Sequence, residues 1–325
     1  MNIQSLITEG VMNMKKRPRI VVFGSMHYDY VMWAEKLPAV GETVIATKFA
    51  TFIGGKGANQ AVQASKLGAE VYMIGRIGND FMGDEVMKSL EKNGVITEYV
   101  KRDSHFGTGT ASVMVDNNGS NYLMVASRAN TACTFEDINE ALDLIKSADI
   151  FMTQIETNIP VTEYSLKIAY ENNVKTIFNP APARKISKEV FKYSHIVTPN
   201  ETEAEIHTGI KQEKDIEKWC EDVTSEFRNI GVKTLVITLG KNGAFLYDNN
   251  KSLIIPTYTH IKAVDTTAAG DAFNGAMAVG LAEGMTLEEA IKFANGAGTI
   301  AASREGAQAS LASREELDCF MSTVA

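Results

Sequence analysis

The sequence predicts an α/β fold in which a mainly parallel sheet lies between two layers of helices, with a small β-sheet beside it. Short apolar runs alternate with helical patterns along most of the 325 residues, which is typical of a parallel sheet covered by helices. Two stretches of β-like pattern interrupt this alternation. The composition, 45% hydrophobic and 22% charged, is that of an ordinary globular protein.

The alternation can be followed along the chain. Strands of the core sheet are expected where short apolar runs are bounded by polar residues, at 20–23, 70–74, 150–154, 176–178, 195–198 and 235–238. Helices are expected between and after them, at 58–67, 80–92, 135–147, 160–172 and 213–229. Past a strand-like run and a polar turn at 244–251, the pattern predicts only helices, at 270–283, 287–302 and 314–321.

The two interruptions predict a separate small sheet. Residues 28–52 favour short β segments, and residues 109–125 favour a hairpin whose turn is the Asp-Asn-Asn-Gly sequence at 116–119. Such a sheet, projecting near the C-terminal ends of the core strands, would act as a lid. We therefore expect one domain over 19–322, with the lid inserted at about 28–52 and 105–127, after an N-terminal extension of residues 1–18.

Charge and cysteine content restrict the partners. The net charge of −8 and pI of about 5.3 argue against nucleic acid as a partner. No apolar run reaches the ~18 residues of a membrane span, and the positive charges near residue 15 follow the first apolar stretch, the reverse of a secretory signal. Cys133, Cys220 and Cys319 have no C-x-x-C spacing, which argues against disulfides or zinc and fits a reducing compartment. We expect a cytoplasmic protein.

The strongest local signal is DTTAAGD at residues 265–271, followed by a helix of small residues. Small residues let the backbone approach a ligand closely, and amide groups at a helix N-terminus bind anions. A carboxylate there would repel phosphate unless it had a task, so Asp271 is interpreted as a general base that takes a proton from an attacking hydroxyl. The sequence leaves open the alternative that Asp271 only caps the helix.

Three further motifs are weaker when each is taken alone. The segment FIGGKGAN at 52–59 has neither Walker nor dinucleotide-binding spacing, but its glycines with Lys56 and Asn59 would suit a hydroxyl-rich ligand. Asn200 and Glu203 stand one helical turn apart after a strand, where they would hold magnesium through water; alternatively, Asn200 or Thr202 would only cap a helix. The glycine turn at 240–243 would line a nucleotide or form an ordinary β-turn.

Taken together and in this order, the motifs resemble the ribokinase branch of the PfkB carbohydrate-kinase family. The sequence GGKGAN at 54–59, with Gly68 and Gly78, is similar to the family's first signature, and residues 265–276 are similar to its second. The sequences NPAPA at 179–183, TPNETE at 198–203 and GAQ at 306–308 look specifically like ribokinase. The resemblance covers about residues 20–317. It implies a ribokinase-like αβα fold and the reaction of D-ribose with ATP to give ribose 5-phosphate and ADP.

The resemblance also implies roles for individual residues. Asp271 would be the base, and the amides of Ala268, Ala269, Gly270 and Asp271 would form an anion hole for the transferring phosphate. The residues implied to bind sugar are His27, Asp29, Gly55, Lys56, Asn59, Glu156 and Asp271. Those implied to surround the nucleotide are Asn200, Thr238, Gly240, Gly243 and Asn295, with Asn200 and Glu203 serving magnesium through water. A monovalent-cation site, expected to take potassium, would use Asp265, Thr267, Ala301, Arg304, Gly306 and Ser310.

Two residues depart from the family pattern. His27 stands where ribokinases typically have Asn, so it would change the contacts to a sugar hydroxyl or serve as a structural histidine. Arg128 stands beside the predicted lid where a small residue is usual, and it would bind an anionic group of the substrate or face solvent. Both departures keep 2-deoxyribose, another pentose or hexose, or a nucleoside open as the substrate.

Two other classes of function remain to be compared with a sugar kinase. A catalytically silent sugar-binding regulator could keep this fold, but it would gain nothing from a buried base. An NAD-dependent dehydrogenase is disfavoured because the glycine fingerprint is missing after the first strand. By analogy with the family, we also expect a homodimer formed through the lid sheets, since an exposed sheet edge seeks a partner.

Overall fold

The computed structural model describes residues 17–324, and within them the main sheet has nine strands in the order β13-β12-β11-β10-β9-β8-β1-β4-β5. The seven strands from β11 to β5 run parallel, while β12 and β13 form an antiparallel edge. This confirms the predicted α/β class. The strands are β1 (Arg19–Phe23), β4 (Glu70–Gly78), β5 (Ile96–Asp103), β8 (Ile150–Thr153), β9 (Lys175–Phe178), β10 (Ile196–Val197), β11 (Thr234–Thr238), β12 (Ala244–Asp248) and β13 (Lys251–Ile255).

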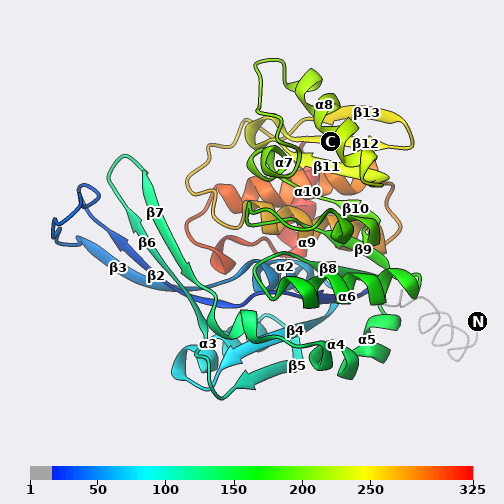
Figure 1. Cartoon of the computed structure of the whole chain (residues 1–325). Coiled ribbons are helices and arrows are strands. Elements are labelled where there is room, and N and C mark those ends of the chain that lie inside the picture. The colour runs from blue at the N-terminus through cyan, green and yellow to red at the C-terminus, as the bar shows by residue number, and fades with distance from the viewer. Residues whose placement is uncertain (1–16, 325) are drawn as a thin grey trace, which may run out of the picture.

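Helices cover both faces of this sheet (Figure 1). Successive side chains of a strand point to opposite faces, and β1 follows this rule: Ile20 and Val22 belong to one buried apolar cluster, Val21 and Phe23 to the other. The first cluster includes residues of α2 (Lys56–Lys66), α3 (Phe81–Lys92), α9 (Ala269–Ala282), α10 (Leu287–Ala302) and α11 (Arg314–Val324). The second includes residues of α4 (Phe135–Glu140), α5 (Leu142–Lys146), α6 (Ile159–Glu171), α7 (Glu201–Thr208) and α8 (Ile216–Asn229).

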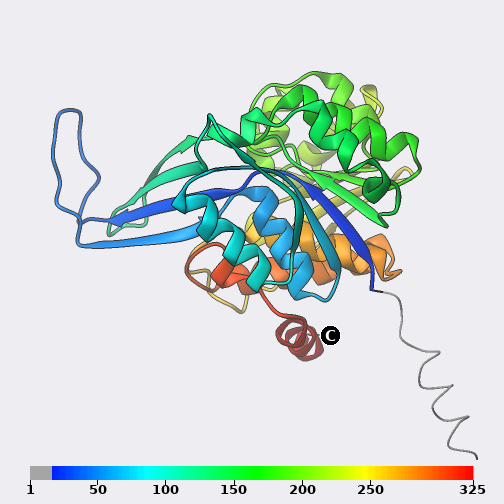
Figure 2. The same ribbon diagram turned by 90° about the horizontal axis from the view of Figure 1, so that it is seen from below.

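A second sheet, here called the lid sheet, projects from the core as Figures 1 and 2 show. Its strands, in the order β3-β2-β6-β7, are β2 (His27–Trp33), β3 (Lys48–Gly54), β6 (Gly109–Val115) and β7 (Asn121–Ala126). The two hairpins join through parallel pairing of β2 with β6. Strand β7 is exposed along its whole length, including four large apolar side chains at 122–125. Strand β7 is therefore an exposed, apolar edge of the lid sheet.

The structure also corrects several expectations. The helix predicted over 135–147 is two helices, because Ala141 leaves the helical conformation (φ −92°, ψ 8°) between α4 and α5. The edge strands β5 and β13 and the short helix α7 were not among the expected elements. Most of the predicted N-terminal extension, residues 1–16, lies outside the described residues. Of the helices in residues 17–324, none combines the length and the apolar character that crossing a membrane requires.

Candidate active site

Polar side chains gather at the edge of the sheet where its parallel strands end. Ser25 follows β1, and Glu156 follows the neighbouring strand β8. The next three strands contribute in turn Asn179 after β9, Thr198 after β10 and Thr238 at the end of β11. The carboxyl ends of parallel strands are where open α/β sheets bind ligands. The strand order thus brings residues from widely separated parts of the chain to one place.

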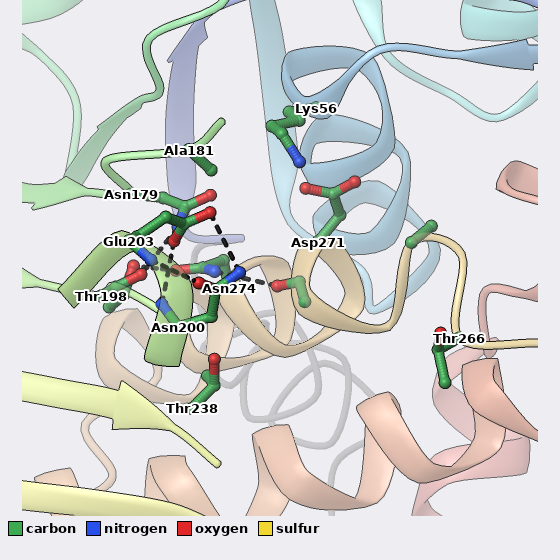
Figure 3. Close-up of a pocket in the computed structure, with 12 residues that line it drawn as sticks. Lys56, Asn179, Ala181, Thr198, Asn200, Glu203, Thr238, Thr266, Asp271 and Asn274 are labelled. Carbon is green, nitrogen blue, oxygen red and sulfur yellow. Dashed lines mark hydrogen bonds between the residues drawn. The ribbon is translucent and has the colours of Figure 1, made fainter. Parts of the chain in front are cut away.

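A cavity of about 200 Å³ opens at this edge beside the first turn of α9 (Figure 3). Of the residues predicted to act in catalysis or binding, it is lined by Lys56, Asn200, Glu203, Thr238, Ala268, Gly270 and Asp271. It is also lined by Asn179, Ala181, Thr198, Thr266 and Asn274, which were not predicted as site residues. The glycine-rich segment at 54–59 and the DTTAAGD segment therefore meet in space although about 210 residues separate their hydrogen-bonded members.

Asp271 is held at the bottom of this arrangement by two side-chain amides. Asn59 Nδ2 donates to its Oδ2 at 2.9 Å, and Gln60 Nε2 donates to its Oδ1 at 3.1 Å. The residue is only 6% exposed, and burial raises the pKa of its carboxyl group above the ordinary value. Ala268, not Asp271, is the N-cap of α9, and no side chain caps that helix. The capping alternative is therefore wrong, and the Asp271 carboxylate is held by other side chains rather than by the helix backbone.

The backbone before Asp271 forms an anion nest, defined here as residues 268–271. Ala268 has a left-handed conformation with φ of 61°, which is unusual for a residue with a side chain and turns successive amides toward one side. The amide of Ala269 donates to Thr266 O at 3.2 Å, so it is not free as predicted. No internal acceptor is found among residues 17–324 for the amides of Ala268, Gly270 and Asp271. Three amides, rather than four, are available to an anion.

The first turn of α9 is held in place by Asn274, a residue one turn further along the same helix. Asn274 Nδ2 donates to Gly270 O at 2.9 Å, and Asn274 Oδ1 accepts from Thr198 Oγ1 at 2.6 Å. Asn179 Nδ2 in turn donates to Thr198 O at 2.7 Å, and Asn179 Oδ1 accepts from Gln60. These bonds tie the ends of β9 and β10 to the nest. Preorganised donors of this kind stabilise charge without having to reorient during a reaction.

Lys56 brings a positive charge to the same point. It is the first residue of α2, and in Figure 3 its amino group is directed toward the carboxylate of Asp271. Burial opposes its charge, but the negative charges of Asp271, Glu156 and Glu203 raise the pKa of Lys56 above the ordinary value. Lys56 is therefore protonated at neutral pH. A cation here can attract the phosphate that a nearby carboxylate would repel.

Helix α2 can start so close to β1 because of a glycine. Gly55 is the N-cap of α2 with φ of 91° and ψ of 130°. A Cβ atom on Gly55 would lie 2.7 Å from Met26 Cα and 2.8 Å from His27 N, which no side chain could satisfy. The glycine thus allows the helix N-terminus, with Lys56 and Asn59, to pack against the segment that follows β1.

Next to the cavity lies a second cluster, in which buried polar atoms lack partners. Among the described residues, Asp29 Oδ1, Asn59 Oδ1 and His27 Nε2 are buried with no hydrogen bond. Burial and the charge of Glu156 raise the pKa of Asp29 to about 7, and burial lowers the pKa of His27. An unsatisfied buried polar group costs ~1–3 kcal/mol, so this cluster suits a ligand with several hydroxyl groups. Asn59 joins it to Asp271.

Glu156, which follows β8, fixes this second cluster through its hydrogen bonds. Its Oε2 accepts from Ser25 Oγ and, at 3.2 Å, from the backbone N–H of Lys56. Although burial opposes ionisation, the electrostatic effects of nearby His27 and Lys56 and these hydrogen bonds lower the pKa of Glu156. Glu156 is thus ionised. The predicted sugar-binding residues His27, Asp29, Gly55, Lys56, Asn59 and Glu156 lie together around β2 and the start of α2.

Asn200 and Glu203 form a reciprocal cap of α7. Glu203 N donates to Asn200 Oδ1 at 2.8 Å, and Asn200 N donates to Glu203 Oε2 at 2.9 Å. The capping interpretation is therefore correct for Asn200, which is the N-cap, and not for Thr202; the part of Glu203 in the cap was not predicted. They also line the cavity, and burial raises the pKa of Glu203, whose side chain faces Lys56 and Asp271. Carboxylate and amide oxygens are the donors that a water-bridged Mg²⁺ would accept, so the residues present fit that ion.

The remaining residues predicted to surround a nucleotide lie farther along the strand ends. Thr238 lines the cavity, but Gly240, Gly243 and Asn295 do not. Asn295 is buried and donates to Ile255 O at 3.1 Å and Pro256 O at 3.2 Å, while Gly243 lies directly against Ile255 O. Gly243 and Asn295 thus pack on one segment, residues 255–257, beyond the cavity.

The six residues predicted to bind a monovalent cation lie on two segments that meet behind the nest. Asp265 Oδ1 accepts from Thr267 N at 2.9 Å, and Oδ2 accepts from Gly306 N at 3.0 Å. Ala301 O accepts from Arg304 N in the turn that ends α10, and the buried Ser310 donates its hydroxyl to Ala307 O. The guanidinium of Arg304 pairs with Glu316 instead of pointing inward. Backbone carbonyls and one carboxylate are suitable ligands for a hard cation.

Arg128, the second departure from the family pattern, folds back onto the base of the lid sheet. It has a left-handed conformation with φ of 46°, and its Nη1 donates to Thr108 O at 3.2 Å. Its charge also helps to lower the pKa of Asp80, the N-cap of α3. The guanidinium is therefore occupied by the protein, which favours a structural role over recognition of an anionic substrate.

Among the residues not predicted, four hold the site together through side-chain hydrogen bonds: Gln60, Asn179, Thr198 and Asn274. Asn179 and Thr198 end apolar strands, so the rule that ligands bind at strand ends could have indicated them. Asn274 lies one helical turn after Gly270, the spacing at which a side chain reaches back to a free carbonyl. Gln60 gives no such signal, because its contacts with Asp271, Asn179 and Gln154 depend on the tertiary fold.

Comparison with known proteins agrees with this geometry. A family model described as pfkB family carbohydrate kinase matches residues 17–314. The chain is 37% identical to a ribokinase of Haemophilus influenzae over 92% of its own length and 97% of the relative, and 37% identical to a ribokinase of Bacillus subtilis over 93% and 99%. A structure of Arabidopsis thaliana ribokinase complexed with ribose and ATP superposes with a TM-score of 0.88 at 31% identity, covering 94% of this chain and 99% of that one. The chain belongs to the pfkB family of carbohydrate kinases.

Proposed function

We propose that this carbohydrate kinase is a ribokinase, which transfers the terminal phosphate of ATP to D-ribose and releases ribose 5-phosphate and ADP. The observation that carries the proposal is the position of Asp271, a buried carboxylate at the end of a nest of free amides and beside Lys56. The similarity to ribokinases over more than nine tenths of the chain supports ribose as the acceptor.

In the proposed reaction, Asp271 accepts the proton of the primary hydroxyl while the hydroxyl oxygen forms a bond to the terminal phosphorus. The bond from that phosphorus to the bridging oxygen breaks, and ADP leaves with the electron pair. The free amides of Ala268, Gly270 and Asp271 and the ammonium of Lys56 stabilise the negative charge on the phosphoryl oxygens. Asn59 and Gln60 keep the carboxylate in place through their hydrogen bonds.

The sugar is proposed to occupy the cluster of unpartnered atoms at β2. Asp29 Oδ1 and Asn59 Oδ1 accept hydrogen bonds, and a sugar supplies hydroxyl donors that satisfy them. His27 Nε2 completes the set, and Glu156 holds the floor of the cluster through Ser25 and Lys56. Thr238, Gly240, Gly243 and Asn295 are proposed to surround the nucleotide beyond the cavity. The lid sheet, which carries His27 and Asp29, would close over the bound sugar and exclude water.

Two ions complete the proposal. Magnesium, which neutralises charge on the ATP phosphates, would be held through water by Asn200 and Glu203. Potassium would be held by Asp265, Thr267, Ala301, Arg304, Gly306 and Ser310, several of them through backbone carbonyls. Asp265 joins the segment before the nest to Gly306, so an ion bound there would order the nest without touching phosphate.

His27 gives a specific reason to keep a second substrate in view. An imidazole replaces the amide that ribokinases usually place here, and a neutral imidazole offers one donor and one acceptor where an amide offers two donors and an acceptor with two lone pairs. A hydroxyl that depends on the amide would bind less well. We therefore keep 2-deoxyribose, followed by other pentoses, hexoses and nucleosides, as the alternative acceptors.

We also propose that the protein is cytoplasmic and dimerises through the lid sheet. The three cysteines, all free, support a reducing compartment. The exposed side chains of Tyr122, Leu123, Met124 and Val125 support the dimer, because an unpaired edge strand with apolar side chains favours association. Sedimentation of the wild type and of a Leu123→Lys, Met124→Glu double variant tests it. A monomeric wild type would refute the dimer.

The proposed function is tested by coupling ADP formation to a panel of acceptors at fixed ATP and magnesium. Ribose is expected to give the highest kcat/KM, and phosphorus NMR of the product should place the phosphate on the 5-hydroxyl. A protein that turns over another sugar faster would keep the kinase chemistry and overturn ribose. A protein that hydrolyses or transfers no phosphate with any acceptor would refute the function itself.

A further inference from the structure

The lid sheet touches the loop that leads into η4 (Gln308–Ser310), and the contact is made by Phe52 on β3. A Cβ atom on Gly306 would lie 3.0 Å from Phe52 Cε1 and 3.1 Å from Cδ1, so the ring edge lies directly on the glycine. Gly306 also has φ of 87°, a conformation that side chains disfavour. The positive φ of Gly306 and its lack of a side chain thus allow the Phe52 ring to pack against the loop.

From Gly306 the connection continues to the anion nest. The Gly306 N–H donates to Asp265 Oδ2, and the other oxygen of that carboxylate accepts from Thr267 N–H. One carboxylate thus bridges the loop at Gly306 and the segment that leads into the nest. Thr267 directly precedes Ala268, the left-handed residue that orients the nest.

In the other direction, Phe52 connects the loop at Gly306 to the cluster of unpartnered polar atoms that includes Asp29. Phe52 is the register partner of Asp29 across the β2–β3 ladder. Its ring also packs edge-on against Trp33, with centroids 6.4 Å apart, and Lys48 lies over that indole and pairs with Glu305 at 3.6 Å. The Lys48–Glu305 pair is exposed and contributes little. The apolar contact of Phe52 is therefore the main link between the lid sheet and the loop.

We propose that Phe52 is a positioning residue for phosphoryl transfer. The strand pair that holds the sugar through Asp29 presses on Gly306, and Gly306 with Asp265 fixes the segment that carries the nest. Sugar bound at the lid sheet thereby restricts the motion of the amides that receive the phosphate. This happens before transfer begins. The inference rests on the proposed sugar-kinase function and adds to it a residue that contacts neither sugar nor phosphate.

The test compares Phe52→Ala with a matched control, Phe49→Ala. Phe49 lies on the same strand, but its ring is 59% exposed and stacks on Tyr30 with centroids 6.3 Å apart, away from Gly306. Phe52→Ala is expected to lower kcat by about 10- to 100-fold, because small displacements of a reacting group have effects of this size. The KM for ribose should change much less. Phe49→Ala should leave both constants near wild type, and Phe52→Leu should restore part of kcat.

A second readout does not depend on turnover. Amide hydrogen exchange, followed by mass spectrometry of peptides containing Thr267 and Gly306, is measured with and without saturating ribose. Ribose should slow exchange of both peptides in the wild type and in Phe49→Ala, but not in Phe52→Ala.

The outcomes separate this inference from the proposed function. If the wild type turns over ribose and Phe52→Ala keeps its kcat, or if ribose protects both peptides equally in that variant, the coupling is refuted while the kinase function stands. If the wild type neither binds nor phosphorylates any sugar of the panel, the proposed function fails and the coupling fails with it. Circular dichroism melting of each variant shows that the comparison is made between folded proteins.

Discussion

Replacing Asp271 by Asn tests the proposed base with little change of shape. Both partners of the carboxylate are donors, Asn59 Nδ2 and Gln60 Nε2, so the new amide would place its NH₂ against one of them. The unpartnered Oδ1 of Asn59 resolves this conflict, because a 180° rotation of that side chain presents an acceptor to the introduced amide. The variant can therefore keep the packing of the site while losing the proton acceptor, although Asn59 would then turn its Nδ2 instead of its Oδ1 toward the sugar.

The expected loss of kcat is ~10²–10⁴-fold, the usual contribution of a positioned base. At ~1.36 kcal/mol per tenfold, this corresponds to about 2.7–5.4 kcal/mol of transition-state stabilisation. The sugar dissociation constant should change far less, since Asp29, Glu156 and the N-terminus of α2 remain. Stability should not fall: burial raises the pKa of Asp271, which means that the fold disfavours its charge, and Asn removes that charge.

The assay pairs kcat, from coupled ADP formation, with the melting temperature, and it uses Asp137→Asn as a matched control. Asp137 is equally buried but lies outside the site, where it accepts from Arg76 Nε at 2.7 Å and pairs with Lys101 at 3.1 Å. These interactions lower its pKa against the effect of burial. The control should lose ~1–3 kcal/mol of stability and keep its kcat. A variant Asp271→Asn that keeps near-wild-type kcat would show that Asp271 is not the base.

Three further outcomes are expected. Exchanging potassium for sodium at constant ionic strength should lower kcat severalfold, because the ion would order the nest through Asp265; equal rates would remove the cation site. His27→Asn should raise the kcat/KM ratio of ribose to 2-deoxyribose by roughly 2- to 10-fold, the value of one hydrogen bond to a hydroxyl; an unchanged ratio would make His27 structural. Because the pKa of Asp29 is raised to about 7 in the sugar-free protein, the folded state binds a proton that the unfolded state releases between about pH 4 and 7. The wild type should therefore lose stability relative to Asp29→Asn as pH rises through this window, and melting curves whose difference does not vary with pH would contradict the shift.

The sequence predicted the six central strands because buried parallel strands are short, continuous apolar runs. It missed β5 and β13, which lie at the two sheet edges: the sequence of β5, ITEYVKRD, is largely polar, and β13, KSLII, has only three consecutive apolar residues. It also could not separate α4 from α5, because neither Gly nor Pro marks the break at Ala141.

Within the site, residues on a local motif could be predicted, and residues that act through tertiary contacts could not. Asp271 and Lys56 belong to segments rich in small residues, which the sequence alone associates with an anion site at 268–271 and with a hydroxyl-rich ligand at 54–59. The contact of Gln60 with Asp271 could not be predicted, because it depends on the packing of α2 against α9. Asn200 and Glu203 supported two interpretations, and the fold shows that they cap α7 and also line the cavity. The hydrogen bond from the Ala269 amide to Thr266 O could not be predicted, because the sequence does not indicate the turn that forms it.

The residues proposed to bind the acceptor and those proposed to transfer phosphate share a helix but not a strand. His27 and Asp29 lie on β2, whereas Asp271 and the free amides lie at the start of α9, and α2 contributes Lys56 and Asn59 to both groups. Exchange of His27 is therefore expected to change the choice of sugar more than the phosphoryl-transfer chemistry. Strand β2 is accordingly the first place to mutate when a new substrate is sought.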